Sequence, residues 1–125
     1  MEKEAEKAQK LMREGKLQEA VAGLQQKSRT PASQKERLFW NLTLSQLLLK
    51  SNKPRLARPY LDQILGEVDF YHLEAWDPAL ALKCLKLVWT GFNALQEPAM
   101  KDAAREVLYR IAKLDLGEGI RLGLG

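Results

Sequence analysis

The sequence predicts an all-α protein with about six helices, stacked as antiparallel α-hairpins. Apolar residues recur at helical spacing along most of the 125 residues, and no segment shows the strict alternation of a strand. Glycine, asparagine and proline interrupt this periodicity where helices would end or begin. An internal repeat with an offset of 37 residues pairs Gly15, Ala20 and Leu24 with Asn52, Ala57 and Leu61. This spacing of turn residue, small residue and leucine is typical of a tetratricopeptide-like hairpin.

The first 32 residues are expected to form one helical hairpin. A helix over about residues 2–14 carries its apolar residues on one face, and a second helix runs from about residue 17 to residue 26. Gly15 lies between them, where the left-handed backbone that ends many helices favours glycine. Residues 28–32 are polar and include a proline, which predicts a loop before the next helix.

Residues 33–114 are expected to form the core of the domain. Ser33 and Glu36 make a capping box that starts a leucine-rich third helix, and Asn52 ends this helix in place of a glycine. A fourth helix follows that turn. The last helix of the core follows Pro98, with apolar residues on one face and charged residues on the other.

The segment Leu73–Leu82 is the most informative local pattern, because it predicts the start of the fifth helix. Asp77 can accept hydrogen bonds from the N–H groups of the first turn, and Pro78 occupies the first helical position. Trp76 is expected to fold back onto that turn as a hydrophobic staple. The helix continues to about Leu95 and is apolar over most of its circumference, which indicates that it is either central in the domain or covered by another subunit.

Five large apolar residues are the expected anchors of an oligomer interface or of the core, and the sequence leaves both roles open. A domain of this size has difficulty burying both the third and the fifth helix, which favours an interface over a central helix in a monomer. The three tryptophans lie at helical spacing among leucines, which is more typical of packing than of a ligand cage. The five anchors are Trp40, Trp76, Trp89, Phe92 and Leu85.

Residues 115–125 are a Gly-rich tail with two possible structures. The alternation of Ile120, Leu122 and Leu124 favours an extended segment along a neighbouring subunit. The glycines equally favour a frayed terminus.

The composition bounds the class of protein. Hydrophobic residues make up 46% and charged residues 29%, which is typical of a soluble globular domain. A single cysteine excludes an intramolecular disulfide framework and fits a reducing compartment. No apolar signal region begins the chain and no apolar run reaches membrane-spanning length, so we expect a cytoplasmic protein without membrane insertion.

The net charge of +4 does not by itself indicate nucleic acid, because basic and acidic residues interleave along the amino-terminal helix. One cluster has no acid among its members and lies at the turn between the third and fourth helices. A solvated corner is the favoured interpretation, a docking site for an acidic protein surface is the second, and contact with a phosphate backbone is the least favoured. The cluster consists of Lys50, Lys53, Arg55 and Arg58.

Catalysis is not expected. His72 is the only histidine, and Cys84 lies within an apolar helix where thiols are normally inert. No metal-binding, phosphate-binding or dinucleotide-binding pattern occurs. We therefore predict neither an enzyme nor a bound cofactor or metal.

The string from Leu73 to Leu82 resembles the C-terminal, VasJ-type domain of TssA, a component of the bacterial type VI secretion system. The resemblance extends from about residue 5 to residue 114. Three further segments resemble the family's helices in the same order, at residues 15–21, 37–44 and 53–61. The family's N-terminal domain is absent, so we expect the chain to be a fragment of a longer protein.

The resemblance implies self-association of residues 1–125, as a single oligomerisation domain, into a ring of five- or six-fold symmetry, with two stacked rings as one arrangement. It further implies contact with the baseplate, tube and sheath proteins of the secretion system, on the cytoplasmic side of the inner membrane. The alternative is a monomeric tetratricopeptide-like adaptor that binds an apolar peptide or helix in a groove between hairpins.

Overall fold

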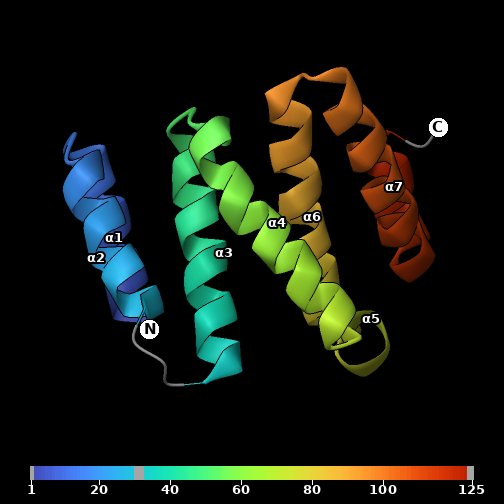
Figure 1. Ribbon diagram of the computed structural model, residues 1–125, viewed down its shortest axis with the longest axis horizontal. Helices are drawn as coiled ribbons and strands as arrows, with labels where there is room; N and C mark the ends of the chain where they lie inside the picture. Colours follow the sequence, from blue (N-terminus) through green and yellow to red (C-terminus); the bar gives the residue numbers. More distant parts are fainter. Residues whose placement is uncertain (1, 30–32, 124–125) are drawn as a thin grey trace. The chain divides into compact units, whose positions relative to one another are not determined.

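The computed structural model describes residues 2–29 and 33–123, and every regular element in these residues is an α-helix (Figure 1). The all-α prediction is therefore confirmed, with two short helices, α5 and α8, beyond those expected. The tetratricopeptide-like character and the ring stay predictions. The helices are α1 (Glu2–Arg13), α2 (Leu17–Arg29), α3 (Gln34–Lys50), α4 (Pro54–Phe70), α5 (Leu73–Trp76), α6 (Pro78–Leu95), α7 (Pro98–Leu114) and α8 (Leu116–Leu122).

The chain divides into two compact units, residues 1–60 and residues 61–125. The first unit contains α1, α2, α3 and the start of α4, and the second contains the rest of α4 and the four helices that follow. That residues 1–125 act as one oligomerisation domain remains a prediction. None of the helices in the described part is both long and apolar enough to cross a bilayer.

The internal repeat appears in the structure as two turns with the same hydrogen bonds. Gly15 and Asn52 both adopt positive φ, at 78° and 58°. The residue after each donates from its backbone N to a carbonyl one turn back in the helix: Lys16 N to Leu11 O and Lys53 N to Leu48 O, both at 2.8 Å. These bonds satisfy carbonyls that the helix ends would otherwise leave without partners. The small and leucine positions of the repeat are buried, at Ala20, Leu24, Ala57 and Leu61.

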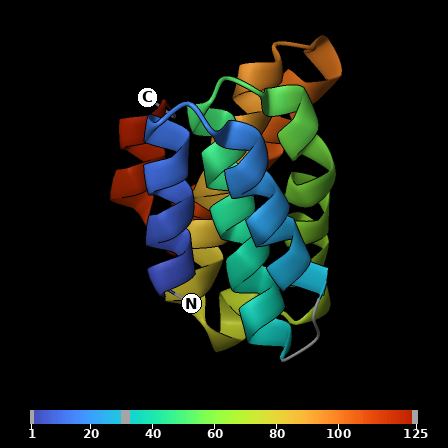
Figure 2. The ribbon, with the colours of Figure 1, turned by 90° about the vertical axis from the view of Figure 1, so that its left-hand side faces the viewer.

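The helices α1 and α2 form an antiparallel hairpin beside α3 (Figure 2). The predicted N-cap of α3 is present, since Ser33 Oγ accepts a hydrogen bond from Glu36 N at 3.1 Å. α3 buries most of its leucines together with the polar residues Asn41 and Ser45, so the helix is enclosed over much of its circumference. α2 runs further than expected, to Arg29, and the remainder of the expected loop, residues 30–32, lies outside the described residues.

In the second unit, α6 and α7 form an antiparallel hairpin (Figure 1). Gln96 ends α6 in the left-handed conformation, and Pro98 begins α7. Gly91 allows α6 to approach α4 closely, because a Cβ there would lie 2.2 Å from Leu61 Cδ1. The buried side of the pair includes Leu85, Val88 and other apolar residues of α6 and α7.

The Gly-rich tail is helical over Leu116–Leu122, which corrects both expectations for this segment. Asp115 Oδ1 accepts a hydrogen bond from Glu118 N at 3.1 Å and so caps the helix. Gly119 lets α8 pack against α7, since a Cβ there would lie 2.5 Å from Ala112 Cβ. The glycine thus serves close packing here instead of disorder. Leu124 lies outside the described residues.

Candidate interaction surfaces

The basic corner, defined as Lys50, Lys53, Arg55 and Arg58, lies at the turn between α3 and α4. All four residues are exposed. The turn is held by the backbone bonds around Asn52, so the charges extend from a fixed backbone. Charges on such an exposed corner contribute little to stability but can guide the approach of an acidic partner.

Charge is divided unequally between the two units. Residues 1–60 hold thirteen Lys and Arg against six Asp and Glu, a net charge of +7, whereas residues 61–125 hold seven against ten, a net charge of −3. The overall +4 therefore conceals a basic first unit and an acidic second unit. Opposite charge on two parts of one chain favours contacts between the unlike parts of different copies.

The aromatic corner, defined as Phe70, Tyr71 and Trp76, lies at the end of α4 and on α5. Phe70 is 75% exposed and Trp76 is 82% exposed, which is unusual for such large apolar side chains. Phe70 and Tyr71 pack edge to face with ring centroids 4.9 Å apart. The staple expected of Trp76 is not formed. Trp76 is the last residue of α5 and points into solvent, whereas Ala81 in the first turn of α6 is buried by other residues.

Arg110 on α7 bonds the side chains of two acidic residues that neighbour the aromatic corner in sequence. Its Nη2 donates to Asp69 Oδ1 at 2.6 Å and also bonds Glu74 Oε1, while its Nε donates to Glu74 Oε1 at 3.2 Å. The hydrogen bond with Glu74, supported by that with Asp69, raises the pKa of the guanidinium above its usual value. One cation thus ties the end of α4 and the helix α5 to α7. No local pattern predicts this cluster, because Arg110 lies 36 residues after Glu74 and 41 residues after Asp69.

Asp77 joins α5 to α6. Its backbone N donates to Leu73 O at 2.8 Å, and its side-chain Oδ1 accepts from Leu80 N at 3.2 Å. Pro78 stands at the first position of α6. Both residues thus occupy helix-start positions, and Asp77 is half-buried.

The remaining predicted anchors differ in burial. Trp40, Leu85 and Phe92 are buried, and Trp89 is half-buried. Trp76 alone among the five stands in solvent. The structure therefore brings Leu85 and Phe92 together on the buried side of α6 and leaves Trp76 on a separate surface.

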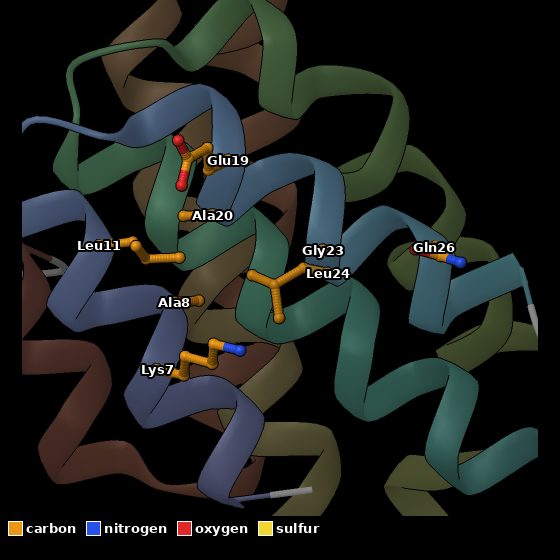
Figure 3. Close-up of a pocket in the computed structure, with 8 residues that line it drawn as sticks. All are labelled: Lys7, Ala8, Leu11, Glu19, Ala20, Gly23, Leu24 and Gln26. Atoms are coloured by element: carbon orange, nitrogen blue, oxygen red, sulfur yellow. The ribbon is translucent and has the colours of Figure 1, made fainter.

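A groove of about 380 Å³ lies along the α1–α2 hairpin (Figure 3). We call it the hairpin groove. Its floor consists of small and aliphatic residues, and charged or polar side chains stand at its rim. The sequence did not single it out, because it forms only where α1 and α2 pack together and the small residues Ala8, Ala20 and Gly23 leave space unfilled between them. The lining residues are Lys7, Ala8, Leu11, Glu19, Ala20, Gly23, Leu24 and Gln26.

The two residues considered for catalysis lie in unsuitable surroundings. Burial, with a contribution from the charge of Glu67, raises the pKa of the Cys84 thiol to about 11. The thiol is therefore protonated at neutral pH and is a poor nucleophile. His72 is exposed at the start of α5, in the left-handed conformation.

Comparison with known protein families identifies a relationship over most of the chain. A family model described as "Type VI secretion, EvfE, EvfF, ImpA, BimE, VC_A0119, VasJ" matches residues 1–88, which include α1 to α5 and α6 up to Val88. No curated protein and no solved structure matches the chain.

Proposed function

Because this chain belongs to the VasJ and ImpA family of type VI secretion proteins, we propose that it is the self-assembling ring domain of a TssA protein. In this role it supports assembly of the baseplate, tube and sheath, on the cytoplasmic side of the inner membrane. The family membership is the observation that carries the proposal. The part of the chain that the family model covers contains the basic corner, the hairpin groove and the aromatic corner.

Two features of the second unit support self-association. Phe70 and Trp76 expose most of their surface, and aromatic residues are enriched at the centres of protein interfaces. The acidic charge of this unit is complementary to the basic charge of the first unit. Exposed aromatic surface and complementary charge both favour binding between copies of the chain.

The mass of the purified chain in solution tests the proposal. We expect light scattering at micromolar concentration to give several times the monomer mass of 14.2 kDa, with one dominant species as expected for a closed ring. A monomer under these conditions would refute the ring.

The basic corner is the proposed docking site for an acidic surface of the tube or sheath. Replacing all four of its residues with glutamate should leave helicity and oligomer mass unchanged but weaken capture of these proteins in low salt. A matched control places the same four charge reversals on exposed positions of the second unit, at Lys83, Lys101, Arg105 and Lys113. Equal capture by both variants would show that docking occurs elsewhere.

Nucleic acid is the competing ligand for the same corner. If the corner bound DNA, the affinity would fall steeply as the salt concentration rises, because several phosphates would be neutralised. We expect no gel shift at physiological salt. A shift that the glutamate variant abolishes would replace the docking proposal with a nucleic-acid site.

The hairpin groove favours a second candidate function, that of a monomeric adaptor for an apolar peptide or helix. Its floor of Ala8, Leu11, Ala20 and Leu24 could accept the apolar face of a helix. This candidate requires a monomer with a free groove, so the same mass measurement separates the two functions.

A further inference from the structure

We propose that copies of this chain join head to tail, with the aromatic corner of one copy seated in the hairpin groove of the next. The inference rests on the proposed self-assembly and assigns its two faces. It is drawn from three observations: an apolar hollow in the first unit, exposed aromatic side chains in the second unit, and opposite charge on the two units.

The size of the hairpin groove fits two aromatic side chains. A buried cavity of about 150 Å³ is enough to hold a benzene molecule. The groove, at about 380 Å³, is more than twice as large. Phe70 and Trp76 are the two most exposed large apolar residues of the described chain, at 75% and 82%. Both would lose most of this exposure in the groove, while Ala8, Ala20 and Leu24 on its floor are already buried, so the gain comes from the two aromatic side chains.

The charges around the two faces are complementary. Residues 61–77, which carry the aromatic corner, contain five acidic residues and no Lys or Arg. Arg110 pairs with two of those acids, and the local balance remains acidic. On the other face, Lys7 and Glu19 both line the groove, and Lys3 and Lys10 lie one turn from Lys7 on the same side of α1, so this rim has a net positive charge. Oppositely charged surroundings of the corner and the groove speed the encounter of two copies and disfavour contact between two like faces.

A contact between unlike faces has a consequence for assembly. A pair of bound copies keeps one free groove at one end and one free aromatic corner at the other, so growth continues until the last copy meets the first. A head-to-tail contact therefore gives a ring when its rotation closes. A contact between identical faces would stop at a dimer.

Two variants each remove one face. Gly23→Tyr places a ring in the groove, and the backbone tolerates it because a Cβ at Gly23 meets no atom within 4 Å. The double variant Phe70→Ser with Trp76→Ser removes the two most exposed side chains of the aromatic corner. We expect each variant to lose the oligomer and run as a monomer with unchanged helicity. If Gly23→Tyr lowers helicity, Gly23→Gln is the replacement, since glutamine is a better helix former.

Matched controls keep both faces. Ala22→Tyr adds the same ring one residue earlier on α2, at an exposed position outside the groove lining. Leu116→Ser with Ile120→Ser removes two exposed apolar residues of α8, at 67% and 56% exposure. Both controls should keep the wild-type mass.

Mixing the two variants is the decisive experiment. The groove variant retains its aromatic corner and the serine variant retains its groove, so an equimolar mixture should form a one-to-one dimer and no larger species. Two monomers that stay monomeric on mixing would overturn the head-to-tail contact, as would oligomers of wild-type mass in either variant. These results would contradict only the location of the contact, because a wild-type ring could then form through other faces. A monomeric wild-type chain instead refutes the proposed function.

Discussion

Replacing Asp77 tests whether this residue is a helix cap or an interface group. The first turn of α6 has few backbone donors to satisfy, because Pro78 has no N–H and the N–H of Asp77 already bonds Leu73 O. The Asp77 carboxylate accepts from Leu80 N, one of the two N–H groups that remain in that turn. Asp77→Ala leaves this group without its partner.

The expected loss follows from these contacts. An N-cap replaced by alanine destabilises a helix by about 1 kcal/mol, of which roughly 0.3–1 kcal/mol is the charge acting on the helix dipole. Asp77→Asn keeps an acceptor oxygen and loses only the charge, so its effect should be about half as large. For a chain of this length, 1 kcal/mol corresponds to roughly 4 °C in melting temperature.

Thermal unfolding followed by circular dichroism measures both variants, and light scattering checks the oligomer. Asp102→Ala is the control, because this exposed acid of α7 has only a long ion pair of 3.9 Å to Arg105. Its melting temperature should change by less than about 2 °C. An Asp77→Ala protein that melts like the wild type refutes the cap. Loss of the oligomer at an unchanged melting temperature would make Asp77 an interface residue.

Three further predictions concern single side chains. Ser45 Oγ is fully buried and has no hydrogen-bond partner among the described residues, so Ser45→Ala should raise stability by about 1 kcal/mol in urea unfolding; a loss would indicate an unseen partner. Cys84 should react with a thiol reagent at least about tenfold more slowly in the folded protein than in urea, because burial raises its pKa; equal rates would contradict this. Hydrogen bonds from Arg121 and Lys86 lower the pKa of Glu118 from 4.5 to about 2, so their stabilisation is present above pH 4.5 and is lost as the pH falls toward 2. An NMR titration of the Glu118 carboxyl with a midpoint near 4.5 would show that these bonds do not persist in solution.

The helix boundaries could be predicted where a few consecutive residues decide them. Gly15 and Asn52 end helices because left-handed backbone suits glycine and asparagine, and both have positive φ. Ser33 caps α3 through a bond to a residue only three positions away. Signals of this kind are complete within one helical turn, so the sequence alone contains them.

The short helices and the exposed aromatic residues could not be predicted in the same way. Trp76 reads as a staple when only its neighbours are considered, but α5 turns it outward. The seven residues of α8 include two glycines, which indicated a tail. Packing of Gly119 on Ala112 makes this segment a helix instead. Tertiary contact overrode the local preference in both segments.

The sequence by itself determined the all-α class, the repeat of turns 37 residues apart, and the family resemblance, because each depends on spacing along the chain. Only the tertiary structure decided which apolar residues are core and which are surface. Leu85 and Trp76 were equal candidates in the sequence, yet the first is fully buried and the second stands in solvent. Burial depends on residues distant in sequence, as does the bridge from Arg110 to Asp69 and Glu74. The hairpin groove likewise exists only once α1 and α2 pack, since its lining residues come from both helices.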